Sequence, residues 1–296
     1  MKILIFGASG LVGGNMLKYF KSLPDVEVVG THFSYETPDT VPFNTLDLDA
    51  ESNFDAHGFN PDVIINCGAL TWVDYCEENI DESYTKTVVS TINTLKICNA
   101  VNAKYLYIGT DYVFDGEAGP YTEDAHPHPL NVYARHKQEA ETLVFNTSKK
   151  NLSLRITNVY GDELRDKNFV ARLMNLAKNG ETQHLKLPFD QYATPVNAWD
   201  IARAAYLLLR DDKNGIYNIA STDFVNRVQL AQMVLNRFPE HQVTIEPIST
   251  EDLNPPAKRP LTGGLITAKF LSEYPDFQFD NVNSYLSRKL EEQAVS

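Results

Sequence analysis

Tyr133 and Lys137 are a pair of residues whose types and spacing could do chemistry. They stand four positions apart in a segment with helical periodicity, so both side chains project from one face of the same helix. A nearby ammonium favours phenolate over phenol and lowers a phenol pKa that starts near ~10. Such a tyrosine could give a proton to a carbonyl oxygen near neutral pH. The spacing is also common on surface helices, so the pair alone does not identify a catalytic site.

Thr110 is a third candidate for the same site, because it stands at the end of an apolar run that predicts a strand over 105–110. The carboxyl ends of parallel strands face the ligand crevice of an open α/β sheet. A hydroxyl there could bond a substrate carbonyl oxygen and stabilise the developing alkoxide. We therefore predict Thr110, Tyr133 and Lys137 as the catalytic residues.

A glycine-rich loop follows the first predicted strand directly and opens the first predicted helix. Gly7 permits a tight turn, Gly10 lets the backbone approach a pyrophosphate, and Gly13 lets helix and strand pack closely. The helix N-terminus adds amide donors and its dipole. This context favours dinucleotide binding over a purely structural turn. We predict that the loop binds the cofactor through Gly7, Ser9, Gly10, Leu11, Val12 and Gly13.

The end of the second predicted strand normally selects between NAD and NADP, because a carboxylate there bonds the ribose 2′-hydroxyl of NAD. Here residues 30–34 contain no carboxylate, which favours NADP, and no arginine that would clamp a 2′-phosphate. Asp47 either lies near the adenine or caps a helix. The remaining cofactor-binding predictions in this part of the chain are Thr31, His32, Asp47 and Leu48.

Short β-branched runs alternate with helical stretches through the first half of the chain, which predicts βαβ units, right-handed crossovers and a doubly wound parallel sheet. We expect an α/β Rossmann domain over 1–160, to which 190–210 returns, and a smaller, interleaved substrate-binding lobe over 161–296. The predicted strands are 2–6, 26–31, 63–67, 105–110 and 152–155, and the predicted helices 11–22, 79–102, 131–147, 168–178 and 199–210.

The net charge of −13 argues against nucleic acid and anionic membranes as partners. The first apolar run is too short for a signal peptide and no run reaches the ~20 residues of a spanning helix, so we expect a cytoplasmic protein. The three cysteines should be reduced. His126 and His128 stand between prolines without a third ligand, so we predict no metal site. The oligomeric state stays open, with a homodimer as one alternative.

Several sequence motifs in this chain resemble those of a known family. The glycine loop, Thr110 and Tyr133-x-x-x-Lys137 resemble the extended short-chain dehydrogenase/reductase superfamily. Within it, the chain is similar to the dTDP-4-dehydrorhamnose reductase family. The strings are Gly109-Thr-Asp-Tyr-Val-Phe-Asp-Gly116, Pro120-Tyr-Thr-Glu, Arg155-x-x-x-Val-Tyr-Gly161, Asn168-Phe169 and Asp190-Gln-Tyr-Ala-Thr-Pro195, with a fainter match at Lys258-Arg-Pro260.

The resemblance implies NAD(P)H-dependent reduction of the 4-keto group of a nucleotide-linked 6-deoxy sugar. Thr110 would orient the keto oxygen, Tyr133 would protonate it, and Lys137 would hold the nicotinamide ribose. It also implies that Cys67, Gly68 and Ala69 pass the cofactor. The candidate substrate-binding residues are Thr71, Asp111, Tyr112, Val113, Asn158 and Arg259, where Asn158 stands in place of a tryptophan usual in the family.

Two other functions remain open for this pattern. One is a non-catalytic, cofactor-binding subunit that resembles the regulatory subunit of methionine adenosyltransferase and binds a partner enzyme. The other is a nucleotide-sugar epimerase, which would recycle its NAD without net consumption.

Overall fold

The central strands are apolar on both faces, and their alternating side chains form two hydrophobic layers. In β1 (Lys2–Phe6), Ile3 and Ile5 pack into the layer on one side. Leu4 and Phe6 pack into the layer on the other side. Successive side chains of a strand point to opposite faces, so such a run belongs in the middle of a sheet that is covered on both sides.

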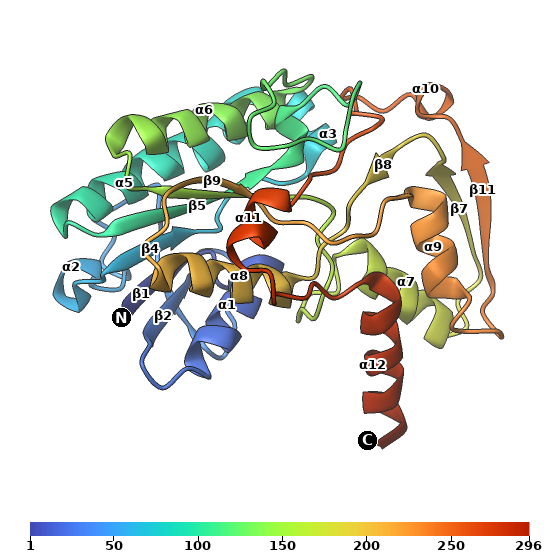
Figure 1. The fold of residues 1–296 in the computed structure, drawn as a ribbon, viewed down its shortest axis with the longest axis horizontal. Helices are drawn as coiled ribbons and strands as arrows, with labels where there is room; N and C mark the ends of the chain where they lie inside the picture. The colour runs from blue at the N-terminus through green and yellow to red at the C-terminus, as the bar shows by residue number, and fades with distance from the viewer. Residues whose placement is uncertain (296) are drawn as a thin grey trace.

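The computed structural model describes residues 1–295 and contains a central sheet of seven strands in the order β3-β2-β1-β4-β5-β6-β9 (Figure 1). Every pairing in this sheet is parallel. The order reverses between β1 and β4, which is where such sheets bind ligands. The predicted α/β doubly wound fold is confirmed. Its strands are β1, β2 (Glu27–His32), β3 (Thr40–Pro42), β4 (Val63–Asn66), β5 (Lys104–Thr110), β6 (Leu152–Ile156) and β9 (Gly215–Asn218).

Helices cover both faces of the sheet: α5 and α6 on one side, α1 and α8 on the other (Figure 1). Within residues 1–295 no helix has an apolar stretch long enough to cross a bilayer. The helices are α1 (Leu11–Lys21), α2 (Ala56–Phe59), α3 (Val73–Glu78), α4 (Ile80–Tyr84), α5 (Ser90–Ala100), α6 (Val132–Thr147), α7 (Phe169–Lys178), α8 (Ala198–Arg210), α9 (Arg227–Leu235), α10 (Thr250–Leu253), α11 (Ala268–Glu273) and α12 (Val282–Val295).

The helix predicted over 79–102 is present over 80–100, but it contains a π-helical turn and begins after a break at Asn79. Asn79 has a non-helical backbone (φ −131°, ψ 65°) and separates α3 from α4. A π-helical turn, η1 (Thr85–Val89), then joins α4 to α5. The Thr87 hydroxyl in this turn accepts the Leu70 N–H at 3.4 Å, so the irregular turn contacts the loop that follows β4. Helical periodicity alone does not reveal such a turn.

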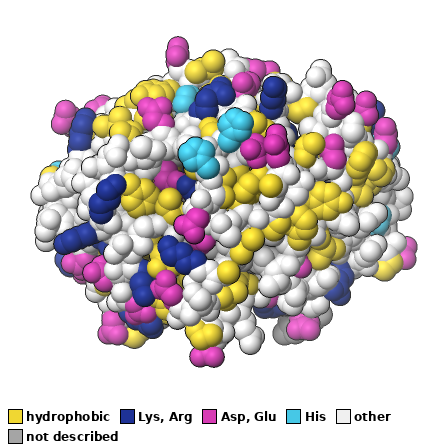
Figure 2. All heavy atoms as spheres, turned by 45° about the horizontal axis from the view of Figure 1, so that its top comes forward, with side chains coloured by type: hydrophobic (Ala, Val, Ile, Leu, Met, Phe, Trp, Pro, Cys, Tyr) yellow, Lys and Arg dark blue, Asp and Glu magenta, His cyan; other side chains and the backbone are white. Residues whose placement is uncertain are grey.

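The second lobe has its own core, built by α7, α9 and α12 (Figure 1). The same lobe contains two small sheets of two strands each. One is the parallel pair β7 (Gln183–Pro188) and β11 (Val243–Ile248), and the other is the antiparallel pair β8 (Tyr192–Ala193) and β10 (Val225–Asn226). Figure 2 shows hydrophobic side chains gathered on the right half of one face, the side of this lobe, with charges of both signs interspersed.

The chain returns from the second lobe to the central sheet over a longer stretch than predicted. α8, within the expected range 190–210, packs against α1. β9 then adds a further strand beside β6, and Phe270 of α11 joins the core layer of α1 and α8. The two lobes are therefore interleaved along the chain.

Candidate active site

Thr110 stands at the junction between β5 and the short 3-10 turn η2 (Asp111–Val113). Its Oγ1 accepts the Tyr112 N–H at 3.2 Å and so caps the turn. Below it, Asp111 accepts hydrogen bonds from Thr157 Oγ1 at 2.6 Å and from the Gly264 N–H at 3.2 Å. Burial raises the pKa of Asp111, and these hydrogen bonds oppose the rise. The residues after the strand are thus held in one arrangement.

Tyr133 lies in the first turn of α6, and that turn is fixed by its cap. The Asn131 side chain accepts the Ala134 N–H at 2.9 Å and donates to the Lys258 carbonyl at 2.8 Å. The Tyr133 ring meets the Tyr112 ring edge-on, with centroids 5.8 Å apart. Burial raises the pKa of Tyr133, and a side-chain hydrogen bond with Thr110 opposes this rise. The phenol is therefore protonated at neutral pH.

Lys137 lies one turn further along α6 and points into the sheet. Its Nζ donates to the Ile108 carbonyl at 2.7 Å and lies 4.2 Å from the centre of the Tyr107 ring. Burial lowers its pKa to about 8, against an opposing effect of Glu141. The expectation that this ammonium lowers the pKa of Tyr133 is not met, because its charge is directed at a backbone carbonyl and burial decides the Tyr133 pKa.

A buried ion pair lies one turn beyond Lys137. Arg155 Nη2 donates to Glu141 at 2.6 Å, and the two side chains are 3% and 6% exposed. Ser153 Oγ donates to the same carboxylate at 2.7 Å. The pair ties α6 to β6, and so fixes the helix that carries Tyr133 and Lys137 relative to the sheet.

The glycine loop has the shape that a pyrophosphate requires. Gly7 has φ +78°, and a Cβ added to it would lie 2.9 Å from the Gly68 nitrogen. A Cβ on Gly13 would lie 2.5 Å from the Gly7 carbonyl oxygen. Side chains are therefore excluded at both positions, and the backbone stays accessible at the N-terminus of α1. The loop fits a dinucleotide.

One cavity of about 600 Å³ joins this loop to the catalytic residues. Burial raises the pKa of Cys67 in its wall to about 12, so this thiol is a packed side chain. Within residues 1–295 no three His, Cys, Asp or Glu side chains are grouped as metal ligands. The predicted site residues that line the cavity are Gly7, Ser9, Gly10, Leu11, Val12, Gly13, Cys67, Gly68, Ala69, Thr71, Thr110, Asp111, Tyr112, Tyr133, Lys137 and Asn158.

Four of the cofactor-binding predictions lie outside the cavity lining: Thr31, His32, Asp47 and Leu48. Thr31 is buried in the sheet, and His32 Nδ1 is 2.8 Å from Thr40 Oγ1 of the edge strand. The Asp47 carboxylate accepts the Asp49 N–H at 3.3 Å within a turn, and Leu48 packs on a core layer. The chain leaves the sheet only after His32, so residues 33–35 line the cavity instead.

Two substrate-binding predictions, Val113 and Arg259, also lie outside the lining. Val113 is 1% exposed and packs with Phe114 in a small core cluster. Arg259 pairs with Asp74 at 2.8 Å. Arg259 does not line the cavity, but its charge opposes the rise that burial causes in the pKa of Tyr112, which does line it.

The second lobe contributes cavity residues that the sequence motifs did not reveal. Arg227, the first residue of α9, donates to Asn158 Oδ1 at 3.0 Å and lies 5.0 Å from the centre of the Phe169 ring. Burial lowers its pKa. Asn158 has φ +39°, a conformation that asparagine tolerates better than tryptophan. The signal available in the sequence was the capping box of Asn226 and Gln229, which marks the start of this helix.

The chain resembles known proteins over most of its length. Residues 1–292 match the family of the RmlD substrate binding domain. The chain is 30% identical to a dTDP-4-dehydrorhamnose reductase of Aggregatibacter actinomycetemcomitans over 282 residues, which cover 90% of this chain and 91% of that protein. It is 29% identical to the methionine adenosyltransferase 2 subunit beta of Xenopus laevis over 255 residues, which cover 84% of this chain and 76% of that protein.

Two solved structures share the fold. A dTDP-4-dehydrorhamnose reductase of Clostridium acetobutylicum is 31% identical, with a TM-score of 0.83 and coverage of 99% of this chain and 100% of that one. A dTDP-4-dehydrorhamnose reductase of Bacillus anthracis in complex with NADP is 23% identical, with a TM-score of 0.84 and coverage of 98% and 99%. This second likeness bears on the fold alone.

Proposed function

This chain belongs to the family of the RmlD substrate binding domain, and from that premise we propose that it reduces the 4-keto group of a nucleotide-linked 6-deoxy sugar with NAD(P)H. The observation that carries the proposal is the convergence of Thr110, Tyr133 and Lys137 on one cavity with the glycine loop. A relative of this family was solved with NADP, and the loop of this chain fits a dinucleotide.

Each catalytic side chain has a role that its position allows. Reduced nicotinamide, when bound, supplies the hydride that adds to the carbonyl carbon. The electron pair of the C=O bond moves to oxygen, where the protonated phenol of Tyr133 gives up its proton. Thr110, beside Tyr133, orients the same oxygen through a hydrogen bond. Lys137 keeps two ammonium hydrogens besides the one on Ile108, so it can hold the ribose of the bound cofactor.

Arg227 gives the substrate end of the cavity its positive charge. The Asn158 amide and the Phe169 ring orient the guanidinium without neutralising it. A planar guanidinium suits the phosphate oxygens of a nucleotide diphosphate. We therefore assign Arg227, which lines the same cavity as the glycine loop, to the diphosphate of the substrate.

The test is NADPH or NADH oxidation, followed by absorbance, with a panel of nucleotide-linked 4-keto sugars. The wild-type protein should consume the reduced cofactor stoichiometrically with one of them. Tyr133→Phe should lower turnover by about 10²-fold or more and leave dinucleotide binding intact. Unchanged turnover in this variant would refute the assignment. Turnover without net consumption of cofactor would indicate an epimerase.

A regulatory role is the second candidate, because the chain also resembles a subunit of methionine adenosyltransferase. Such a role needs the fold and a docking surface and does not need the catalytic set. The intact Thr110, Tyr133 and Lys137 favour the reductase. Recovery of one stoichiometric partner enzyme, together with no cofactor oxidation on any keto sugar, would reverse this order.

A further inference from the structure

Arg165 places a guanidinium at the end of the cavity that follows β2. In Rossmann folds the adenosine ribose of a dinucleotide lies against the residues after this strand. We propose that Arg165 binds the 2′-phosphate of NADP and so makes this site select NADP over NAD. This inference rests on the proposed function, since it concerns the cofactor of the same reaction.

The residues after β2 have the composition that a 2′-phosphate requires. Phe33, Ser34 and Tyr35 line the cavity there, and none of them is acidic. A carboxylate at this place would bond a free 2′-hydroxyl and repel a phosphate. Ser34 instead offers a hydroxyl donor. What residues 30–34 lack is a positive charge, and the structure brings one from a distant part of the sequence.

Arg165 reaches this place from the loop between β6 and α7. Its guanidinium carbon lies 4.7 Å from the centre of the Tyr35 ring, so the aromatic face positions the charge without cancelling it. Lys167 of the same loop also lines the cavity. In the part of the chain that the structure describes, Arg165 takes part in no ion pair with a carboxylate. Its five N–H donors suit a phosphate better than a hydroxyl.

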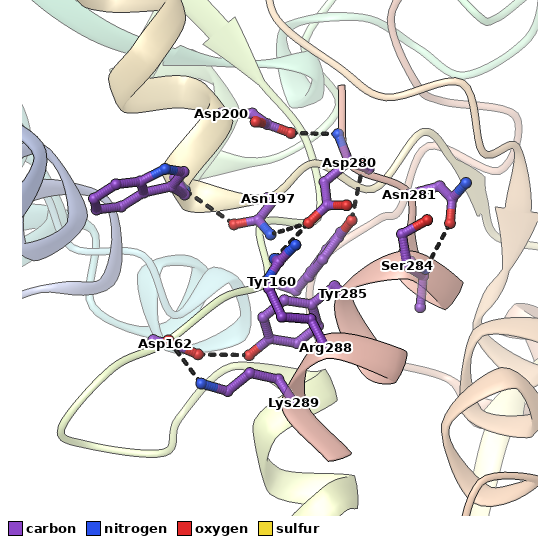
Figure 3. Close-up of polar contacts among 12 residues, drawn as sticks. Tyr160, Asp162, Asn197, Asp200, Asp280, Asn281, Ser284, Tyr285, Arg288 and Lys289 are labelled. Atoms are coloured by element: carbon purple, nitrogen blue, oxygen red, sulfur yellow. Dashed lines mark hydrogen bonds and ion pairs between the residues drawn. The ribbon is translucent and has the colours of Figure 1, made fainter. Parts of the chain in front are cut away.

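The loop that carries Arg165 is anchored at its base, as Figure 3 shows. Asp162 accepts a hydrogen bond from Tyr285 Oη at 2.9 Å and pairs with Lys289 of α12 at 2.9 Å. The Asn15 amide of α1 donates to the Asp162 carbonyl at 2.8 Å. The loop is thereby tied to both α12 and α1, the helix that follows the glycine loop.

Two of the three acidic side chains of this loop, Asp162 and Glu163, have hydrogen-bonding partners of their own. The Asp162 carboxylate faces α12. Glu163 also lines the cavity, and its carboxylate accepts two hydrogen bonds from Asn168, one from the backbone N–H and one from the side-chain amide at 2.7 Å. Beside the Tyr35 ring this loop places the guanidinium of Arg165.

The experiment measures dissociation constants by fluorescence titration with NADPH and NADH, and with 2′,5′-ADP and 5′-ADP as probes that carry or lack the 2′-phosphate. Arg165→Ala should weaken NADPH and 2′,5′-ADP by about tenfold or more and leave NADH and 5′-ADP nearly unchanged, because one charge-assisted contact is lost. Arg165→Lys should fall between. Arg210→Ala, which removes an exposed guanidinium paired with Asp211, is the matched control and should change none of the four.

Equal weakening of all four ligands by Arg165→Ala would overturn the inference, since the residue would then act on a part that both dinucleotides share. No weakening of NADPH would overturn it as well. Both results leave the proposed function intact. If the wild-type protein bound neither dinucleotide, the proposed function itself would fail, and the two failures are thereby distinguished.

Discussion

Glu141→Gln removes one carboxylate oxygen from a place where several donors converge. Arg155 reaches this carboxylate through Nε at 3.2 Å and Nη2 at 2.6 Å, and Ser153 reaches it at 2.7 Å. The glutamine side chain keeps one acceptor oxygen, but its NH₂ group is itself a donor and would face the donors of Arg155 and Ser153. The variant therefore leaves the Arg155 charge buried without a counter-charge, in a site where both side chains are less than a tenth exposed.

Breaking a buried ion pair in this way costs about 3–5 kcal/mol. For a chain of 296 residues 1 kcal/mol corresponds to about 1.6 °C in Tm, so we expect Tm to fall by roughly 5–8 °C. Thermal and urea unfolding followed by circular dichroism measure this. The double variant Glu141→Leu, Arg155→Met removes both charges and should recover most of the loss. Asp211→Asn, at an exposed pair with Arg210, is the control and should change little.

The reasoning fails if Glu141→Gln loses less than about 1 kcal/mol, or if the double variant is less stable than the single one. A second readout is independent of unfolding. Glu141 raises the pKa of Lys137 against the effect of burial, so its neutralisation should lower that pKa further. The alkaline limb of the kcat profile should then move to lower pH.

Three further predictions concern the site. Turnover should fall as the pH rises through about 8, because the Lys137 ammonium loses its proton there; a kcat profile without an alkaline limb would contradict this role. Gly13→Val should abolish dinucleotide binding in equilibrium dialysis, since its Cβ would lie 2.5 Å from the Gly7 carbonyl oxygen. Arg227→Met should raise KM for the nucleotide sugar by roughly tenfold with little change in kcat, as expected for a contact that is equally strong in the ground state and the transition state. An unchanged KM would show that Arg227 does not bind the diphosphate.

Local patterns in the sequence predicted much of the sheet and the centre of the site. β1 and β5 are short apolar runs, and Thr110, Tyr133 and Lys137 are placed by one strand end and one helix turn. Arg227 and Arg165 could not be placed in this way, because each belongs to a different element and meets the cavity only through tertiary packing. Thr31 and His32 were predicted to bind the cofactor at the end of the second strand. Because β2 continues to His32, the cavity-lining residues come after it. β9 is too short for its periodicity to be recognised.

The position of β9 limits how the chain can be divided. All five residues of β6 are buried, and β9 supplies the hydrogen-bonding partners of its outer edge. A fragment ending near residue 160 would keep the glycine loop and Tyr133 but expose that apolar edge, which is a template for association with other chains. Expression of a minimal dinucleotide-binding fragment should therefore yield aggregates, and a permuted chain that keeps residues 215–218 beside β6 is the better design.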